Sequence, residues 1–326
     1  MKKILVIGAG AWGTAIANLL AQNSNQVFLS ANRKETADEI NKNRTNQRFL
    51  PEVKLSKNII AIEDFSQEIK SCELVFIVTP SSATAEVFQK IKDIKPKKCG
   101  FVICSKGFEH GSLMLLSDAF ERITKIKNYA VLSGPNFAIE VANQEPTVTT
   151  IASRKKKLAK TVIDVLSNDN FQAHYFKDPR TAEICGILKN VIAIGCGIVD
   201  GLGLGVNAKS AVVMKGISEI QVLCKKMKAS SDVAHAAGIG DIFLTCSSTK
   251  SRNNSLGLEL SRGKSFNQIL KDTGKTYEGA FSAEAVSQIA KKLKLQLDLC
   301  EEINQIIARK HTPAKIKTII SKSILS

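Results

Sequence analysis

The sequence predicts an α/β fold, with a doubly wound parallel sheet in residues 1–179 and an all-helical domain in residues 180–326. Short, unbroken apolar runs alternate with helical patterns in the first half, which is typical of βαβ units whose sheet is covered on both faces. From about Pro179 onward the helical patterns are long and strand signals are almost absent. A chain of 326 residues also has the length of two ordinary domains.

Five apolar runs in the first half are predicted as strands, and a helix is predicted after the first of them, at residues 13–21. The strands are expected at residues 3–7, 26–30, 73–79, 100–104 and 129–132. In the second half, helices are expected at residues 181–200, 208–226, 282–292 and 297–309. The first of these is apolar nearly all round, which predicts a buried central helix.

The composition indicates a globular protein in a reducing compartment. Hydrophobic residues make up 44% of the chain and aromatic residues 6%, so the core is expected to consist mostly of Ile, Leu, Val and Ala. Eight cysteines occur without C-x-x-C pairs or histidines at metal-ligand spacing, which predicts free, buried thiols and no metal. Neither a signal peptide nor a transmembrane run is visible, which predicts the cytoplasm.

The formal net charge of +16 allows two interpretations. One is nucleic-acid binding, and the other is a lysine-rich surface around an enzyme for anionic metabolites. Lysines are scattered, and the one dense basic run, residues 154–157, has no aromatic residues between its charges. Charge-driven nucleic-acid binding needs a clustered stripe or a stacking platform, so the second interpretation is favoured.

Residues 8–13 read G-x-G-x-x-G, directly after the first strand and before the first helix. Gly8 allows the tight turn, Gly10 lets the backbone approach a pyrophosphate, and Gly13 lets helix and strand pack closely. The helix start, with Ala11 and Trp12, offers free N–H groups to the phosphates. The pattern predicts a Rossmann-type site for NAD(H) or NADP(H), and the alternative is a plain glycine turn.

The end of the second strand bears on the choice of cofactor. Sites specific for NAD usually carry an acidic residue there, but this chain has none until Glu35. Arg33 and Lys34 precede it and are expected to face a 2′-phosphate or to stack on the adenine, unless they form a solvated basic turn. NADP(H) or dual use is therefore favoured over strict NAD(H).

Polar clusters follow two further strands and interrupt one helix. Lys106 follows the strand that ends at Cys104, and the run SGPNFA follows the strand that ends at Leu132. Ligands bind at the carboxyl ends of strands in such sheets. Lys189 lies inside the apolar helix GILKNVIAIGCGI, where a lysine either extends to solvent or takes part in chemistry.

The run GIGDIFLTC suggests a tight turn that presents Asp241 at the start of a helix. Thr245 lies four residues on, on the same face, and this geometry suits a hydrogen-bond network with Lys189. The alternative is a structural cap or an ordinary salt bridge. The four histidines, in polar contexts, are expected at the surface.

At this level of detail the chain resembles a known family, the bacterial NAD(P)-dependent glycerol-3-phosphate dehydrogenases. The resembling stretches run in family order from residue 8 to residue 286: GAGAWGTAIA, SKGFE, LSGPNFAIE, LKNVIAIGCGIVDGLGLGVNAKSA, GIGDIFLTC, SRNN, YEG and AEAV. The sequence departs at Met214-Lys215-Gly216, where Thr-Arg-Gly is frequent, and at Tyr277, where valine is common. Neither position has a proposed catalytic role.

The resemblance implies interconversion of sn-glycerol 3-phosphate and dihydroxyacetone phosphate, which supplies glycerophospholipid synthesis, and it implies a homodimer. It implies that Lys189 is the proton acceptor at the substrate C2 hydroxyl, framed by Asn190, Asp241 and Thr245. The implied substrate contacts are Lys106, Gly134, Asn136, Lys189, Asp241, Ser251, Arg252 and Asn253. The implied cofactor contacts are Trp12, Arg33, Lys106, Ala138, Arg252, Thr276 and Glu278.

The residue chemistry agrees with this assignment. Oxidation of a secondary alcohol needs a hydride acceptor and a base, and partial burial and a neighbouring cation such as Lys106 are expected to lower the pKa of Lys189. Two alternatives share the architecture or the glycine turn. One is a 6-phosphogluconate-dehydrogenase-like or 3-hydroxyacid dehydrogenase, against which SGPNFA and SRNN argue. The other is a non-catalytic dinucleotide sensor, which does not need Lys106, Lys189 and Asp241 together.

Overall fold

The computed structural model describes residues 2–96, 98–248 and 251–325. The chain divides into two compact units, the first reaching to Ala182 and the second beginning at Glu183. Helix α7, Pro179–Gly201, starts in the first unit and continues into the second. The boundary expected near Pro179 thus falls at the first residue of this helix.

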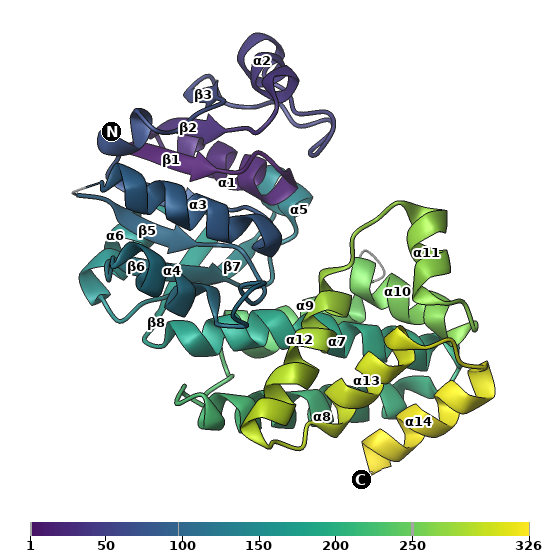
Figure 1. The fold of residues 1–326 in the computed structure, drawn as a ribbon. Coiled ribbons are helices and arrows are strands. Elements are labelled where there is room, and N and C mark those ends of the chain that lie inside the picture. Colours follow the sequence, from purple (N-terminus) through teal and green to yellow (C-terminus); the bar gives the residue numbers. More distant parts are fainter. Residues whose placement is uncertain (1, 97, 249–250, 326) are drawn as a thin grey trace. The chain divides into compact units, whose positions relative to one another are not determined.

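The first unit is built on one eight-stranded sheet (Figure 1). The strands lie in the order β3-β2-β1-β4-β5-β6-β7-β8, and all pairs are parallel except β6 with β7. Their bounds are β1 Lys3–Ile7, β2 Gln26–Ser30, β3 Ile59–Ile62, β4 Leu74–Ile77, β5 Gly100–Ile103, β6 Tyr129–Ser133, β7 Thr147–Ala152 and β8 Phe171–Phe176. From β1 the chain adds strands outward to β3 on one side and then returns to add β4 on the other side. The order of strands therefore reverses between β1 and β4, and doubly wound sheets bind ligands at such a point. The predicted Rossmann-type sheet is confirmed.

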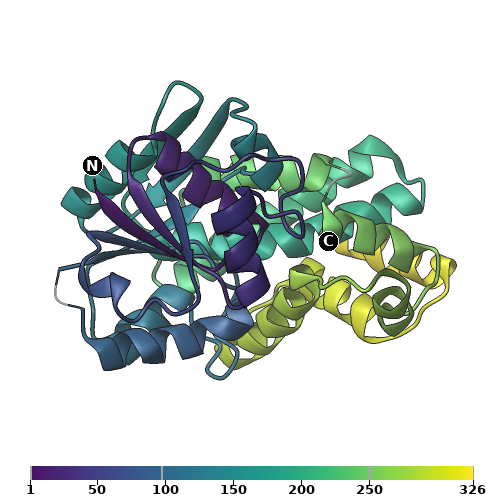
Figure 2. The same ribbon diagram turned by 90° about the horizontal axis from the view of Figure 1, so that it is seen from above.

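Helices cover both faces of this sheet (Figures 1 and 2). On one face α1 contacts α5 and α6, and on the other α3 contacts α4. The helices are α1 Ala11–Gln22, α2 Lys34–Asn43, η1 Glu68–Lys70, α3 Ser81–Ile94, α4 Leu116–Thr124, α5 Ala138–Ala142 and α6 Lys156–Leu166. Burial on both faces explains why β1, β4, β5 and β6 are almost unbroken apolar runs.

The sheet departs from the sequence prediction at both of its edges. Strands β3, β7 and β8 were not predicted, because β3 has only four residues and because threonines and other polar residues interrupt the apolar pattern of β7 and β8. The expectation of a wholly parallel sheet is wrong for β6 and β7. Helix α5 has only five residues and is too short to carry the chain back along the sheet, so β7 runs opposite to β6.

The few aromatic residues contribute more to the core than their number suggests. Phe88 and Phe101 each lie with their ring centroids 5.1 Å from that of Phe120, and Tyr129 lies 6.0 Å from it. The three phenylalanines are among the largest fully buried side chains. Ile, Leu, Val and Ala form most of the remaining core, as expected, but this cluster joins α3, β5 and α4.

The second unit is helical, and no strand occurs in its described part. Besides α7 it contains α8 Gly205–Lys226, η2 Ala236–Gly240, α9 Asp241–Ser247, α10 Arg252–Ser261, α11 Phe266–Thr273, α12 Glu278–Leu293, α13 Asp298–Ala308 and α14 Pro313–Leu325. Among the described helices, α7 alone has the length and apolarity to cross a membrane, and its apolar stretch is entirely buried within the protein. The prediction of a buried central helix is confirmed.

A buried carboxyl in α8 holds the start of α13. Glu219 accepts hydrogen bonds from the backbone N–H groups of Leu299, at 2.7 Å, and Cys300, at 3.1 Å. The residue that precedes α13, Leu297, supplies no side-chain cap. Burial raises the pKa of Glu219 despite these two bonds. The carboxyl therefore takes the place of a helix N-cap and fixes α13 to α8.

Replacing Glu219 with alanine should lower the free energy of unfolding by about 2–3 kcal/mol, because two buried N–H groups lose their acceptor. Glu219→Gln keeps one acceptor and should lose less, while Glu284→Ala on the exposed side of α12 should change little. Urea unfolding measures all three. Because the folded pKa is raised, wild-type stability relative to Glu219→Gln should be greatest below the ordinary pKa of 4.5 and should fall as the pH rises through the folded value. Equal losses for the two Glu219 variants would contradict the capping role.

Candidate functional site

The glycine turn at the end of β1 has the geometry that the sequence predicts. Gly8 has a φ of +113°, and a Cβ there would lie 2.8 Å from the carbonyl oxygen of Val78. Gly13 lies so close to the turn that a Cβ would be 1.8 Å from the Gly8 oxygen. Gly10 faces open space, with nothing within 4 Å of its Cβ position. The turn is therefore closed against the protein at two glycines and open to a ligand at the third.

Asn46, which the sequence analysis did not identify, braces this turn. Its fully buried side-chain amide donates to the Ala9 carbonyl at 3.0 Å and to the Thr14 hydroxyl at 2.8 Å. Asn46 follows α2 by three residues, and its pairing with Ala9 depends on the tertiary fold. No local sequence signal points to it.

The other predicted cofactor residues of this unit lie close to the same edge of the sheet. Ala11 and Trp12 open α1, and Trp12 and Ala138 are half-buried against the core. Ala138 begins α5, which packs on α1. Arg33 precedes α2 and Lys34 begins it, and both side chains are exposed after β2.

Three hydroxyl residues form a row at the carboxyl ends of β4, β5 and β6. In the sheet register Ile77 pairs with Ile103, and Ile103 pairs with Val131. Thr79, Ser105 and Ser133 each lie two residues beyond one of these. The Ser105 hydroxyl donates to the Thr79 carbonyl at 2.5 Å. The hydroxyl oxygens of Thr79 and Ser133 are buried and have no hydrogen-bond partner among the described residues.

These observations fit a dinucleotide. A glycine turn open at Gly10 suits a pyrophosphate, and a buried hydroxyl without a partner is costly unless a ligand or water satisfies it. Thr79 was not predicted as a site residue, although a hydroxyl residue at or just after the end of each of three apolar runs is a signal that points to it.

The loop that carries Lys106 is held in shape by Glu109. The Glu109 carboxylate accepts hydrogen bonds from the Ser112 hydroxyl at 2.5 Å and from the N–H groups of Ser112 and Gly111 at 2.8 and 3.1 Å. These bonds, that of the Ser112 hydroxyl first, lower the pKa of Glu109. Gly107 has a φ of +132° and lies against Ser81 of α3. Lys106, half-buried, therefore projects from an ordered loop.

Gly134 and Asn136 are joined to β7 by Thr149. The Thr149 hydroxyl donates to the Asn136 side-chain oxygen at 2.9 Å, and the Asn136 amide donates to the Val148 carbonyl at 3.3 Å. A Cβ at Gly134 would lie 2.9 Å from the Thr149 hydroxyl oxygen. The antiparallel β6–β7 pairing thus fixes both predicted substrate residues.

In the second unit, Lys189 and Asp241 form a buried ion pair. The Lys189 Nζ lies 2.5 Å from Asp241 Oδ1, and the two residues are 8% and 0% exposed. The Thr245 hydroxyl donates to the Asp241 carbonyl at 2.6 Å and lies 3.5 Å from Oδ1. The tight turn η2 precedes Asp241, and a Cβ at Gly238 would be 2.0 Å from the Val233 oxygen. The expected turn, helix and shared network are all present.

The pairing changes the electrostatic expectation for Lys189. Within its own unit its partner is an anion, which stabilises the charged ammonium form. A neighbouring cation, which the sequence analysis considered, would act in the opposite sense. Asn190 is buried beside Lys189 on α7.

The run SRNN, residues 251–254, forms the start of α10 and the residue that caps it. The Ser251 hydroxyl caps the helix by accepting the Asn254 N–H at 3.3 Å. Asn253 is buried, and its Oδ1 accepts the Gly279 N–H at 3.0 Å. Arg252 is exposed, and its Nη1 donates to the Thr276 carbonyl at 3.4 Å. The oxygens of Ser251 and Asn253 are thus used within the protein, and Arg252 presents its charge to solvent.

The segment that carries Thr276 and Glu278 is anchored by the residue between them. Tyr277 is buried, its ring lies 6.3 Å from that of Phe266, and its hydroxyl donates to Thr273 at 3.2 Å. The departure from the family at position 277 therefore adds an anchor to α11, while Thr276 and Glu278 remain exposed.

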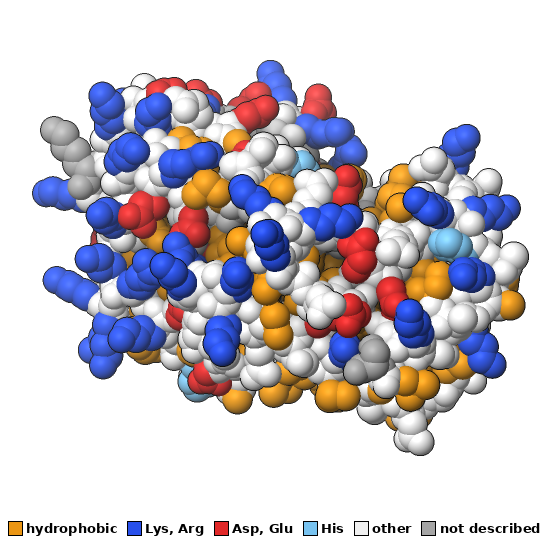
Figure 3. All heavy atoms as spheres, turned by 60° about the horizontal axis from the view of Figure 1, so that its bottom comes forward, with side chains coloured by type: hydrophobic (Ala, Val, Ile, Leu, Met, Phe, Trp, Pro, Cys, Tyr) orange, Lys and Arg blue, Asp and Glu red, His pale blue; other side chains and the backbone are white. Residues whose placement is uncertain are grey.

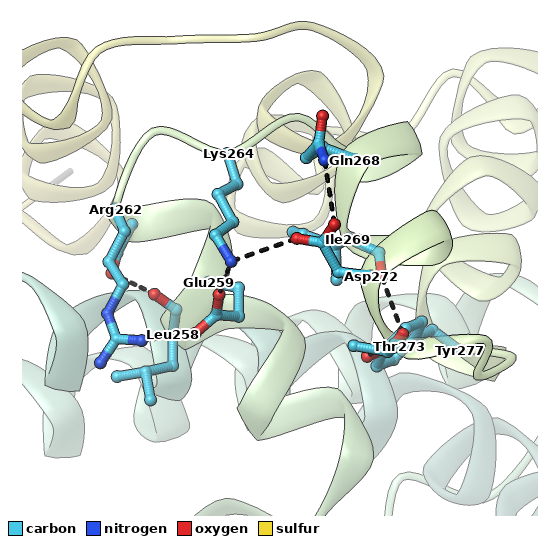
Figure 4. Close-up of polar contacts among 10 residues, drawn as sticks. Leu258, Glu259, Arg262, Lys264, Gln268, Ile269, Asp272, Thr273 and Tyr277 are labelled. Carbon is cyan, nitrogen blue, oxygen red and sulfur yellow. Dashed lines mark hydrogen bonds and ion pairs between the residues drawn. The ribbon is translucent and has the colours of Figure 1, made fainter.

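Charged side chains tie α10 to α11 beside this segment (Figure 4). Lys264 lies 2.8 Å from Glu259 and 3.3 Å from Asp272, and Arg262 also pairs with Glu259. The bond from Lys264 lowers the pKa of Glu259. The α10–α11 pair is thus cross-linked at its solvent face.

Two expectations about histidine and cysteine have different outcomes. All eight cysteines are free and buried, as predicted, and burial raises the pKa of Cys72 to about 12. His235 is half-buried, and burial lowers its pKa, so its expected place at the surface is wrong. It precedes η2, where the turn before Asp241 encloses it.

Two features together define the class of nicotinamide-dependent oxidoreductases. The first is a glycine turn suited to a pyrophosphate, placed where the strand order of a doubly wound sheet reverses, and the second is a helical unit with a buried lysine. Residues 3–159 match the model of the NAD-dependent glycerol-3-phosphate dehydrogenase N-terminus, and residues 178–318 match that of its C-terminus. The chain belongs to this family.

Named relatives agree with the family models. The chain is 37% identical to glycerol-3-phosphate dehydrogenase [NAD(P)+] of Bacillus velezensis, over 94% of this chain and 90% of the relative. It is 36% identical to the enzyme of the same name from Francisella tularensis subsp. novicida, over 97% and 96%. The crystal structure of glycerol-3-phosphate dehydrogenase from Coxiella burnetii is similar, with a TM-score of 0.92, 30% identity and 98% of each chain covered.

The glycine turn leads to a prediction with an internal control. Gly13→Ala should lower the free energy of unfolding by about 1–3 kcal/mol, because its Cβ meets the Gly8 carbonyl. Gly10→Ala should leave the urea midpoint nearly unchanged, yet weaken NADPH and NADH binding by at least about tenfold, because its Cβ fills the open side of the turn. Cofactor fluorescence titration measures the second effect. Normal cofactor affinity in Gly10→Ala would mean that the pyrophosphate does not lie on this turn.

Proposed function

We propose that this chain catalyses reversible hydride transfer between NAD(P)H and dihydroxyacetone phosphate, giving sn-glycerol 3-phosphate for glycerophospholipid synthesis. The observation that carries the proposal is the buried pair of Lys189 and Asp241 on α7 and α9. A buried lysine held by a carboxylate is costly to place in a core, and proton transfer to a substrate oxygen gives it a use.

Lys189 is the acid–base group in this proposal. In the reductive direction its ammonium polarises the C2 carbonyl and donates a proton to the oxygen as the alkoxide forms. In the oxidative direction the neutral amine accepts the hydroxyl proton. A bound nicotinamide supplies or accepts the hydride. Asp241 orients the lysine and compensates its charge, and Thr245 and Asn190 complete the polar frame.

The cofactor assignment rests on the first unit and on the resemblance. Gly8, Gly10, Ala11, Trp12 and Gly13 bind the dinucleotide phosphates at the start of α1. Arg33 and Lys34 face the adenosine end, which favours NADPH or dual use. Further cofactor contacts are Lys106, Ala138, Arg252, Thr276 and Glu278. Thr79 and Ser133 are additional candidates, because their buried hydroxyls lack a partner in the described chain.

The substrate assignment centres on Arg252. Its planar guanidinium at the start of α10 suits a phosphate dianion. The remaining substrate contacts are Lys106, Gly134, Asn136, Lys189, Asp241, Ser251 and Asn253. In this proposal the donors are the hydroxyl hydrogen of Ser251 and the side-chain amide N–H groups of Asn253. The side-chain oxygens of both residues already accept backbone bonds, and the Ser251 N–H donates to the Ser248 carbonyl.

We infer that the protein is a cytoplasmic homodimer. Each chain consists of a dinucleotide-binding domain, residues 1–179, and a substrate-binding and catalytic domain, residues 180–326. Eight free cysteines support a reducing compartment. Nucleic acid is not a proposed partner. Figure 3 shows Lys and Arg spread over the face in view, with Asp and Glu among them, which suits the attraction of anionic metabolites.

The test of the proposed function is NADH and NADPH absorbance with dihydroxyacetone phosphate added. Consumption of either cofactor that depends on this substrate supports the proposal, and the ratio of kcat/KM for the two cofactors gives the preference. A dinucleotide sensor would bind cofactor without oxidising it. Turnover with 6-phosphogluconate or a 3-hydroxyacid instead would favour the other dehydrogenase classes.

Removal of Lys189 alone would take from the buried Asp241 the lysine that compensates its charge, at a cost of about 3–5 kcal/mol. The double variant Lys189→Met/Asp241→Asn avoids this cost. It should lower kcat by about 10²–10⁴ while cofactor binding persists, because the proton donor is lost. The matched control is Lys209→Met/Asp200→Asn, which removes a more exposed pair at 2.7 Å in the same unit and should keep normal turnover. Near-normal kcat in the Lys189 double variant would exclude its catalytic role.

Arg252→Ala should reduce kcat/KM for dihydroxyacetone phosphate by about 10- to 100-fold, because charge-assisted bonds to the phosphate are lost. Reduction of dihydroxyacetone, which has no phosphate, should change much less. Arg262→Ala, an exposed arginine at the other end of α10, is the control. Steady-state kinetics with both substrates separate kcat from KM. An equal effect on both substrates would place the phosphate elsewhere.

A further inference from the structure

Gly279 lies where the first turn of α12 meets α7 and α10. Its N–H donates to Asn253 Oδ1 at 3.0 Å. A Cβ at this position would lie 2.7 Å from that oxygen and 2.9 Å from the backbone oxygen of Asn190. Both distances are shorter than a carbon normally approaches, and one of the two atoms belongs to the main chain.

The backbone of Gly279 does not itself require glycine. Gly279 lies in the first turn of α12 and does not have a positive φ, so alanine would suit the helix better than glycine does. Its missing side chain instead permits the approach of three helices. The Asn253 Oδ1 that a Cβ would displace also accepts the bond from the Gly279 N–H. The Asn253 side chain therefore cannot turn away from a Cβ without losing this hydrogen bond.

The helices that meet here are already in close backbone contact. A Cβ at Gly197 of α7 would lie 2.0 Å from the Asn254 oxygen, and a Cβ at Gly257 of α10 would lie 2.0 Å from the Ile194 oxygen. Such helix pairs resist sliding, because no side chains separate them. Displacement at Gly279 would therefore move α12 rather than the α7–α10 pair.

Catalytic and cofactor groups lie on either side of this contact. Asn190 follows Lys189 on α7. Thr276 and Glu278 immediately precede Gly279, and the Thr276 carbonyl accepts from Arg252. Two adjacent residues of α10, Arg252 and Asn253, thus hold the start of α12 at two points.

We propose that Gly279 is a positioning residue that sets the distance between the cofactor-contacting segment at Thr276–Glu278 and the proton donor Lys189. The inference rests on the proposed function, since it uses the roles assigned to these residues. A side chain at position 279 would part α12 from α7 and misalign hydride and proton transfer while both ligands still bind. Misplacement by about 1 Å can cost about 10²-fold in rate.

The experiment compares Gly279→Ala with Gly274→Ala. Gly274 ends α11 with a φ of +60° and has open space at its Cβ position, so alanine there strains the backbone without a close contact. For Gly279→Ala we expect kcat to fall about 10- to 100-fold, with a smaller change in cofactor affinity measured by fluorescence. The primary isotope effect with deuterated NADPH should rise, because the chemical step becomes slower. Gly274→Ala should keep the wild-type kcat and isotope effect.

A purely structural role would lower only the stability and the fraction of active enzyme, and it would leave both the isotope effect and the kcat per active molecule unchanged. That result, or a wild-type kcat in Gly279→Ala, would overturn the proposal. Failure of the proposed function is distinguishable, since wild-type enzyme would then not oxidise NAD(P)H with dihydroxyacetone phosphate. In that case the thermal midpoint still tests the close contact, which requires Gly279→Ala to be less stable than wild type although alanine favours helix.

Discussion

The ion pair between Lys189 and Asp241 is the constraint around which the helical unit is arranged. Burying either charge alone is costly, and a 2.5 Å contact with a fully buried carboxylate compensates the lysine. The pair requires α7 and α9 to stay together, and η2 delivers Asp241 to this position through a turn that only glycine at position 238 allows. Exchange of the pair for apolar residues of similar size would often cost nothing in stability, so its presence is better explained by chemistry.

Close backbone approach supports this arrangement throughout the protein. In the sheet unit Gly13 lets α1 press on the turn after β1, and in the helical unit Gly197, Gly257 and Gly279 let helices meet without side chains between them. Positions held by main-chain contact have few ways to shift, which suits groups that must stay within a fraction of an ångström during catalysis. Glu219 serves a related purpose farther out, where it fixes α13 to α8.

In each of the two units, the polar groups near the predicted site residues are divided between those that bond within the protein and those left for a ligand. Glu109 and Asn46 use their hydrogen-bonding capacity to shape loops, and Ser251 and Asn253 use their oxygens for helix starts. Arg252 remains exposed, and the hydroxyls of Thr79 and Ser133 have no partner in the described ranges. This division separates supporting residues from candidate ligand contacts more clearly than residue type does.

The local sequence predicts the Rossmann-type sheet, the glycine turn and the buried α7, because each depends on apolar periodicity or turn chemistry among neighbours along the chain. It also indicated Asp241 and Thr245 as one network, since they share a helical face. Tertiary packing alone reveals the antiparallel β7, the bracing of the turn by Asn46, the half-buried position of His235 and the close approach of Gly279 to Asn190. These features join residues far apart in sequence. No local pattern specifies which distant backbone atom a side chain will contact, or where a glycine must leave room for one.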